Sequence, residues 1–322
     1  MEVQSKALIL STIVLSLSLT GCGGSSGSST AAPATESTNT TVTGAVADGY
    51  LYGATVCLDL NDNKRCDDSE PTATSGDKGQ YSLSNVNATD VSKHGVVVEV
   101  SASTIDEDTG NPVGKTYILT SPPGKPEFVS PLSTLVHTTM DMLKTTAADA
   151  EHVVKQNMAY GDKDTSLFND YIKAGSDSTS QQLHKVAQIV AYILGQNHQA
   201  LNDAIQQEGL DAYEQSVAAH NLLVQHAFSQ LPNIKAIVLA KSDEGAFSAA
   251  ELETLDAQMS TANIKNKLEK EAEIRAATTN FDIKNIFEKE GGLSSIDKYS
   301  CFGASCTNGF SYDKDTITLS FN

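Results

Sequence analysis

The sequence predicts an α+β protein in which a β-rich segment precedes a helical one. Between residues 42 and 128, five short runs rich in β-branched residues alternate with Gly, Pro, Asn and Asp, which indicates short strands and turns. Between residues 129 and 280, apolar residues instead recur every three or four positions, as on one face of a helix. The order of the two patterns predicts a small antiparallel β-sandwich followed by an antiparallel helical bundle.

The first 21 residues are predicted to be an export signal and not part of the fold. A short head with Lys6 precedes an apolar run, residues 7–20, that is too short to span a bilayer comfortably. The run ends in Leu19-Thr20-Gly21-Cys22, which resembles the lipobox of bacterial lipoproteins. That resemblance implies cleavage before Cys22 and lipidation of its thiol, so that lipid anchors the chain. An ordinary signal with a coincidental cysteine is the alternative.

The residues after the lipobox indicate a location and a tether. Gly23, and not aspartate, follows the cysteine, and in enterobacterial lipoproteins this implies transport to the outer membrane. Residues 22–41 are small, polar and almost uncharged, so they cannot bury a core and are predicted to be flexible. We therefore expect a folded part that is lipid-anchored at the outer membrane, on its periplasmic or cell-surface side.

The charge of the chain restricts its partners. It has 40 acidic and 22 basic residues, a formal net charge of −18. Nucleic acid binding needs a basic surface, so DNA and RNA are not expected partners. The same charge argues against electrostatic docking on an anionic membrane, which leaves the N-terminal lipid as the expected membrane contact.

An acidic loop in the β-rich segment has the spacing of a calcium site. From Asp59 to Glu70, oxygen-bearing side chains occupy positions 1, 3, 5, 9 and 12, as in the pattern D-x-[DN]-x-[DN]-G-x₅-E. Position six is Lys64, where that pattern has the glycine of a sharp turn. A polar turn without metal is the alternative. The predicted ligands are the side chains of Asp59, Asn61, Asn63, Asp67 and Glu70 and the carbonyl oxygen of Arg65.

The residues around this loop resemble a known family. Residues 44–56, the loop ending in Glu70-Pro71, and residues 79–83 are similar to the carboxypeptidase-regulatory-like (transthyretin-type, B-type) sandwich modules of bacterial surface proteins. In those modules the loop lies between two strands. Residues 106–110 and 130–136 are similar to the segment that joins such modules to a helical region. The resemblance implies a structural or adhesive role outside the cytoplasm.

The five cysteines are expected to divide into one lipid carrier and two disulfides. Without Cys22, four remain and allow three connectivities, between which the sequence does not decide. Local pairing, Cys57–Cys66 and Cys301–Cys306, is the expected arrangement for an exported protein. A zinc site is the alternative, although no histidine neighbours either pair. The first disulfide would close a ring at the start of the acidic loop, worth roughly 2–3 kcal/mol by chain entropy.

Helix signals organise the second half of the chain. Ser130-Pro131 is typical of an N-cap followed by proline at the first helical position. Ser248 and Glu251 have the spacing of a capping box. Expected helices span about residues 132–145, 148–159, 165–173, 179–207, 211–230 and 248–277.

Two details of this helical segment are also predicted. The helix beginning near residue 211 is expected to end before Pro232 and to turn Tyr213, Val217, Val224 and Phe228 inward. Residues 281–322 are expected to hold the second disulfide and to end in a strand over residues 316–321, where apolar and polar residues alternate.

No catalytic motif is recognisable. The sequence has no G-x-S-x-G, phosphate loop, H-E-x-x-H or G-x-G-x-x-G. We therefore expect a non-enzymatic, calcium-braced lipoprotein that acts in adhesion, matrix attachment or binding of an envelope protein partner. The alternative is an envelope enzyme, or a transport or assembly accessory, whose site the sequence does not reveal. A cleft of convergent acids would favour the enzyme, and an exposed strand edge or apolar patch the binding protein.

Overall fold

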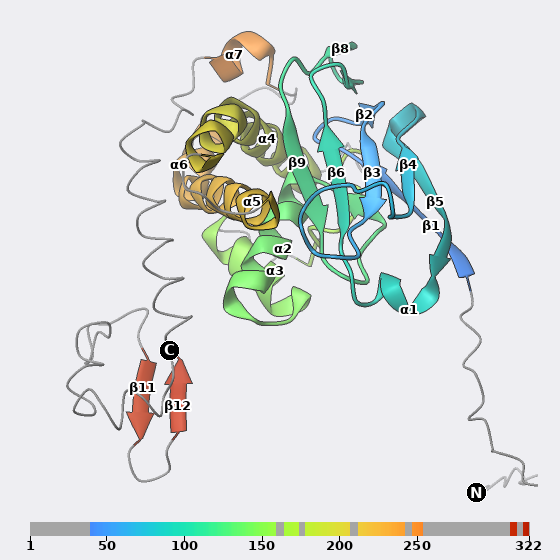
Figure 1. The fold of residues 1–322 in the computed structure, drawn as a ribbon. Coiled ribbons are helices and arrows are strands. Elements are labelled where there is room, and N and C mark those ends of the chain that lie inside the picture. The colour runs from blue at the N-terminus through green and yellow to red at the C-terminus, as the bar shows by residue number, and fades with distance from the viewer. Residues whose placement is uncertain are drawn as a thin grey trace, which may run out of the picture. The chain divides into compact units, whose positions relative to one another are not determined.

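The protein is α+β: strands come first along the chain and helices follow (Figure 1). The computed structural model describes residues 39–158, 164–173, 178–206, 212–241, 247–253, 310–313 and 318–321. The predicted signal, Cys22, most of the tether, Cys301 and Cys306 lie outside these residues. Among the helices described, none combines the length and the apolar character that crossing a bilayer requires.

Ten strands between residues 39 and 129 form three small sheets. Their orders are β10-β1-β5, β2-β7-β8 and β4-β3-β6-β9, and only the β1–β10 pairing is parallel. The five predicted runs contain β1, β3, β5, β6 and β9; the other strands are too short to leave a pattern in the sequence. The strands are β1 Asn39–Val46, β2 Leu51–Tyr52, β3 Thr55–Leu58, β4 Thr72–Thr74, β5 Gln80–Asn87, β6 Val96–Val100, β7 Ile105–Asp106, β8 Asn111–Pro112, β9 Tyr117–Ser121 and β10 Phe128–Val129.

The eight described helical segments begin with two short ones within the β-rich part. They are η1 Asp77–Gly79, α1 Ala88–Val91, α2 Pro131–Leu143, α3 Ala147–Asn157, α4 Ser178–Ile205, α5 Ala212–Ser229, α6 Leu231–Ala240 and α7 Ala249–Glu253. Helix α2 begins as predicted, because Ser130 and Ser133 cap each other's backbone N–H and Pro131 takes the first position.

The strands and helices share one hydrophobic core. Strands β3 and β4 contact β5, while β9, in the same sheet as β3, contacts α2 and α4. The four-stranded sheet therefore lies between the sheet of β1 and β5 and the helices (Figure 1). This position explains why four of the five residues of β6 (VVVEV) are buried and do not alternate with exposed ones. Strand β5, by contrast, alternates, with Tyr81 and Leu83 inward.

Two predictions about the helical segment are wrong. Residues 165–173 form turns and not a helix; the backbone N–H of Leu167 and the hydroxyl of Ser166 both donate to Glu151 Oε1 of α3. The helix α5 ends at Ser229, before Pro232, as predicted; Pro232 lies in the first turn of α6, a further helix that was not predicted, where a missing N–H has no cost. Tyr213, predicted to face inward, is 49% exposed, whereas Val224 is buried as expected.

The last described helix, α7, begins at a predicted signal. At the start of α7, Ser248 N donates to Glu251 Oε2 and Glu251 N donates to Ser248 Oγ, so the predicted capping box is present. The rest of the helix expected up to residue 277 lies outside the described residues. Strands β11 (Phe310–Asp313) and β12 (Thr318–Phe321) pair antiparallel within the predicted terminal segment.

Candidate functional site

The predicted calcium loop joins two paired strands. Strand β3 ends at Leu58, directly before Asp59, and β4 begins at Thr72, directly after Pro71. The strands are antiparallel with Cys57 opposite Thr72, so the two ends of the loop lie side by side. This strand–loop–strand setting is the one that the family resemblance implied, in place of the two helices of an EF-hand.

The acids at the two ends of the loop hold its backbone. Asp59 is 1% exposed and accepts hydrogen bonds from the N–H groups of Asn63 (3.0 Å) and Lys64 (2.9 Å). Glu70 accepts from the N–H groups of Leu60 (2.7 Å) and Asp67 (3.1 Å). Burial raises the pKa of Asp59 to about 6, against the lowering effect of its backbone donors. Each carboxylate oxygen keeps a further lone pair that could bind a cation.

Three other predicted ligands meet in the middle of the loop. The side-chain amides of Asn61 and Asn63 each donate to Asp67 Oδ2 at 2.8 Å. The carbonyl oxygen of Arg65 lies 3.6 Å from Cys57 Sγ. In the part of the chain that the structure describes, no three His, Cys, Asp or Glu side chains are grouped as metal ligands. The structure therefore brings the side chains of Asn61, Asn63 and Asp67 together. The carboxylates of Asp59 and Glu70 are instead hydrogen-bonded to backbone N–H groups of the loop.

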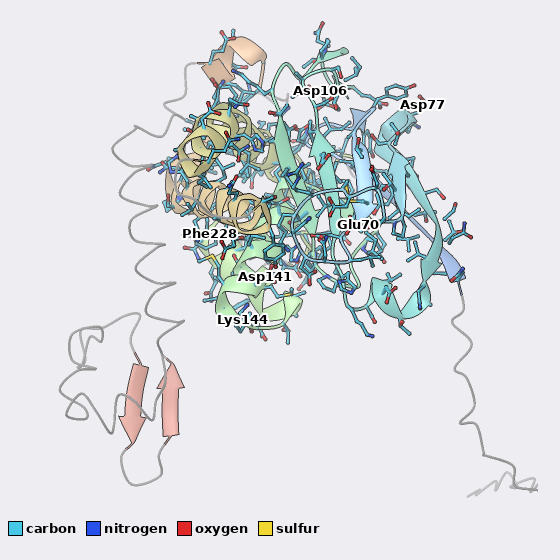
Figure 2. All side chains as sticks on the ribbon, in the orientation of Figure 1. Glu70, Asp77, Asp106, Asp141, Lys144 and Phe228 are labelled. Atoms are coloured by element: carbon cyan, nitrogen blue, oxygen red, sulfur yellow. A yellow bond between two sulfur atoms is a disulfide. The ribbon has the colours of Figure 1, made fainter. Side chains whose placement is uncertain are left out.

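The missing glycine at position six does not prevent the turn. Lys64 has φ of 61°, the left-handed conformation that glycine adopts most easily. Its side chain is buried, and Nζ lies 3.2 Å from Asp141 Oδ2 and 3.4 Å from His137 Nε2, both on α2. Figure 2 labels Glu70 and Asp141, which come from the loop and from α2. Lys64 thus connects the loop to the first long helix, a role for which the sequence has no signal.

The first expected disulfide is present at the start of the loop. Cys57 of β3 and Cys66 are bonded, with their Cα atoms 5.5 Å apart. The N–H of Cys66 also donates to Glu99 Oε1 of β6 at 3.0 Å. The second half of the loop is therefore tied to the four-stranded sheet by one covalent bond and one hydrogen bond.

A second group of acids, which sequence reasoning missed, lies away from this loop. Asp48 follows β1 and accepts a hydrogen bond from the hydroxyl of Tyr117. Asp106 and Asp108, from the β7–β8 hairpin, approach the neighbouring Gly49, where a Cβ would lie only 2.5 Å from Asp106 Oδ1 and 2.7 Å from Asp108 Oδ2. Gly49 therefore lets three carboxylates gather, here called the Asp48 cluster: Asp48, Asp106 and Asp108.

The Asp48 cluster is short of positive charge. Burial, together with the charges of Asp106 and Asp108, raises the pKa of Asp48 to about 7, against the lowering effects of the hydrogen bond from Tyr117 and of the nearby His184. Burial likewise raises the pKa of Asp106. A basic group close to the cluster is His184 of α4, whose Nε2 lies 2.8 Å from Asp108 Oδ2. Shifted acids of this kind are more frequent at functional sites than elsewhere.

Asp48 and Asp106 line a cleft of about 480 Å³ between the β7–β8 hairpin, β9 and α4. Small-molecule sites commonly measure about 300–1,000 Å³. The chain matches no family model, no curated protein and no solved structure. The function must therefore be inferred from the loop and the cleft themselves.

The two candidate sites differ in how far sequence reasoning could find them. The loop residues lie within twelve consecutive positions, so their spacing indicates a shared role. The cleft residues come from the turn after β1, a hairpin, β9 and α4, and no spacing connects them. The only local signal was the Asp106–Gly110 segment, which the family resemblance assigned to a linker.

Proposed function

We propose that this protein is a calcium-braced lipoprotein of the outer membrane or cell surface that acts by binding: in adhesion, matrix attachment or the holding of an envelope protein partner. The observation that carries the proposal is the loop from Asp59 to Glu70, which has oxygen-bearing side chains at the five ligand positions 1, 3, 5, 9 and 12 of the calcium pattern and lies in a strand–loop–strand setting. In this proposal residues 42–128 are the carboxypeptidase-regulatory-like sandwich, and the helices that follow form an antiparallel bundle.

The residues of the loop fit a calcium ion in their chemistry. The side chains of Asp59, Asn61, Asn63, Asp67 and Glu70 and the carbonyl oxygen of Arg65 would hold it. All are oxygen donors, which calcium prefers, and Lys64 adopts the backbone conformation of the missing glycine. The ion would supply positive charge to a loop that is rich in acids and would hold the loop in one conformation.

Strand β5, at the edge of its sheet, supports the proposed binding role. Strand β5 is eight residues long, carries no charged residue and is at the edge of its sheet. Natural edge strands are usually short, charged or covered, because an open edge pairs with other chains. Addition of a strand from a partner to such an edge is a common mode of protein recognition.

Calcium binding can be measured by titration calorimetry of the full chain with calcium chloride. We expect the wild type to bind with a dissociation constant on the order of 10⁻⁴–10⁻³ M, as extracellular modules do. Asp59→Ala and the isosteric Asp67→Asn should weaken binding at least tenfold. Asp77→Asn changes an exposed acid on η1 (labelled in Figure 2) and should leave binding unchanged.

Two outcomes contradict the calcium site. One is the absence of calcium-dependent heat with the wild type. The other is equal affinity in Asp67→Asn, which is expected to fold because asparagine replaces a carboxylate of the same shape. Thermal unfolding gives a second readout, since calcium should raise the Tm of the wild type more than that of Asp67→Asn.

The lipoprotein part of the proposal is tested in cells. Cys22→Ser removes the lipid acceptor, so we expect the protein to move from the membrane fraction to the soluble fraction. Protease shaving of intact cells that express the wild type should degrade the protein. Crosslinking of cells not treated with protease should capture a partner. Resistance to shaving would place the protein on the periplasmic side and exclude adhesion, and membrane retention of Cys22→Ser would contradict the anchor.

The second candidate function is an envelope enzyme, or a transport or assembly accessory. The cleft lined by Asp48 and Asp106 is the observation that favours it, since the pKa of Asp48 is raised to about 7. If the protein turns over a substrate, Asp48→Asn should abolish turnover while Asp67→Asn in the loop retains it. The same loss in both variants would argue against catalysis in the cleft.

A further inference from the structure

The cleft beside the Asp48 cluster is built from five separate parts of the chain. Asp48 comes from the turn after β1, Asp106 from the β7–β8 hairpin, Tyr117 from β9, Tyr192 from α4 and Phe247 from the segment before α7. The segment before α7 is fixed onto α4, because Phe247 N donates to Gln188 Oε1 at 2.9 Å. Described segments of the chain therefore line the cleft, and its volume of about 480 Å³ suits a small molecule.

The charged residues that line the cleft are mostly acidic: Asp48, Asp106 and Glu253 against the single Lys115. Asp108 adds a further carboxylate beside Asp106, and His184 already pairs with it. Partly buried like charges repel one another and lose hydration, so the cluster is costly unless a cation joins it.

Apolar and aromatic residues make up another part of the cleft lining. They include Tyr192, Phe247, Val113 and Leu252. The faces of aromatic rings attract organic cations, and together with carboxylates they recognise ammonium groups. One face of Phe247 already has the Lys241 ammonium 4.8 Å from the ring centroid, and Tyr117 is 3% exposed, so the partly exposed Tyr192 is the aromatic residue left for a ligand.

We propose that this cleft is a binding site for a small organic ammonium, a primary amine carried on an apolar or aromatic body. The ammonium group donates hydrogen bonds to the carboxylates of Asp48 and Asp106, and the body packs against Tyr192 and Leu252. The carboxylates provide specificity for the cation, and the apolar and aromatic residues provide contact area. The proposal does not depend on the calcium loop, which shares none of these residues.

The ionisation of Asp48 adds a pH dependence to this site. The groups that face Asp48 are Tyr117, Asp106, Asp108, His184 and, more distantly, Tyr171. Because the pKa of Asp48 is raised to about 7, its carboxyl group is largely neutral at pH 6 and ionised at pH 8. The affinity for an ammonium ligand should therefore rise between pH 6 and pH 8.

The test is titration calorimetry of the full chain at pH 8 with 2-phenylethylamine and with its neutral counterpart 2-phenylethanol. We expect the amine to bind the wild type at least tenfold more tightly than the alcohol. Asp48→Asn should weaken amine binding at least tenfold and leave alcohol binding unchanged. The control Asp77→Asn, on η1 and away from the cleft, should bind the amine as the wild type does.

Equal binding of amine and alcohol, no amine binding up to millimolar concentration, or full amine affinity in folded Asp48→Asn would overturn the site. Tyr192→Leu, which keeps an apolar side chain on α4, gives an independent variant and should weaken amine binding several-fold. The titrations are repeated with a calcium chelator. Amine binding that persists there separates this site from the loop, so the failure of one proposal does not decide the other.

Discussion

Lys64→Gly is expected to lower the free energy of unfolding by about 3 kcal/mol, although it restores the glycine of the calcium-loop pattern. The change removes a buried side chain and leaves Asp141 and His137 of α2 without the ammonium that lies 3.2 Å and 3.4 Å from them. Glycine relieves the left-handed conformation of Lys64, which is worth about 1 kcal/mol, but this gain is smaller than the loss.

Lys78→Gly is the matched control for this prediction. Lys78 also has a left-handed φ of 55°, but its side chain is exposed. Its backbone N–H donates to Glu107 Oε1, and glycine keeps that hydrogen bond. Lys78→Gly should therefore raise the free energy of unfolding by up to about 1 kcal/mol.

Urea denaturation without calcium measures both variants. Lys64→Met keeps much of the volume of the side chain and removes its charge, so its stability should lie between those of the wild type and Lys64→Gly. Equal stability of Lys64→Gly and the wild type would show that the contact with α2 contributes nothing, and the loop would then be independent of the helices.

Asp48→Asn is expected to stabilise the protein by about 3 kcal/mol at pH 8 and by almost nothing near pH 4. The pKa of Asp48 is 3.8 as a model value and about 7 in the folded protein. Below pH 4 the carboxyl group is largely protonated in both the folded and the unfolded state, so it contributes little to the difference in stability between the wild type and Asp48→Asn. Above pH 7 it is ionised in both, and the folded state bears the cost of a partly buried charge beside Asp106 and Asp108. Asparagine has no charge and still accepts the hydrogen bond from Tyr117.

Chemical denaturation of the wild type and Asp48→Asn at pH 4, 6 and 8 measures this difference. The gap between the two proteins should widen between about pH 4 and pH 7, the unfolded and folded pKa values of Asp48, and level off above pH 7. Asp77→Asn should stay within about 0.5 kcal/mol of the wild type at each pH, as exposed substitutions usually do. A gap that is constant with pH would mean that Asp48 is not the titrating group.

These two predictions concern contacts between the strands and the helices. Lys64 of the β3–β4 loop reaches α2, and the Asp48 cluster meets His184 of α4. The strands and helices also share one hydrophobic core. The stabilities of the β-rich and helical segments therefore depend on each other, and a destabilising change in either segment is expected to destabilise both.

Local patterns predicted much of the fold. The strands β3, β5 and β6 and the start of α2 follow from residue types, turns and a cap within a few positions of each element. Residues 165–173 were misassigned because their conformation depends on Glu151, a residue of the preceding helix. The end of α5 before Pro232 was predicted, but α6 was not, because proline is equally suited to the first turn of a new helix.

The sequence by itself determined the α+β class and the spacing of the twelve-residue acidic loop, because each depends on residues that are near one another in the chain. It made Cys57–Cys66 the expected local pair, and the structure decided that pairing. The tertiary structure alone decided that Lys64 contacts α2 and that Asp48, Asp106 and His184 form one cluster. Residues from position 48 to position 184 come together there because the helices pack on the sheet. Periodicity and spacing describe only neighbours along the chain, so they have no information about such contacts.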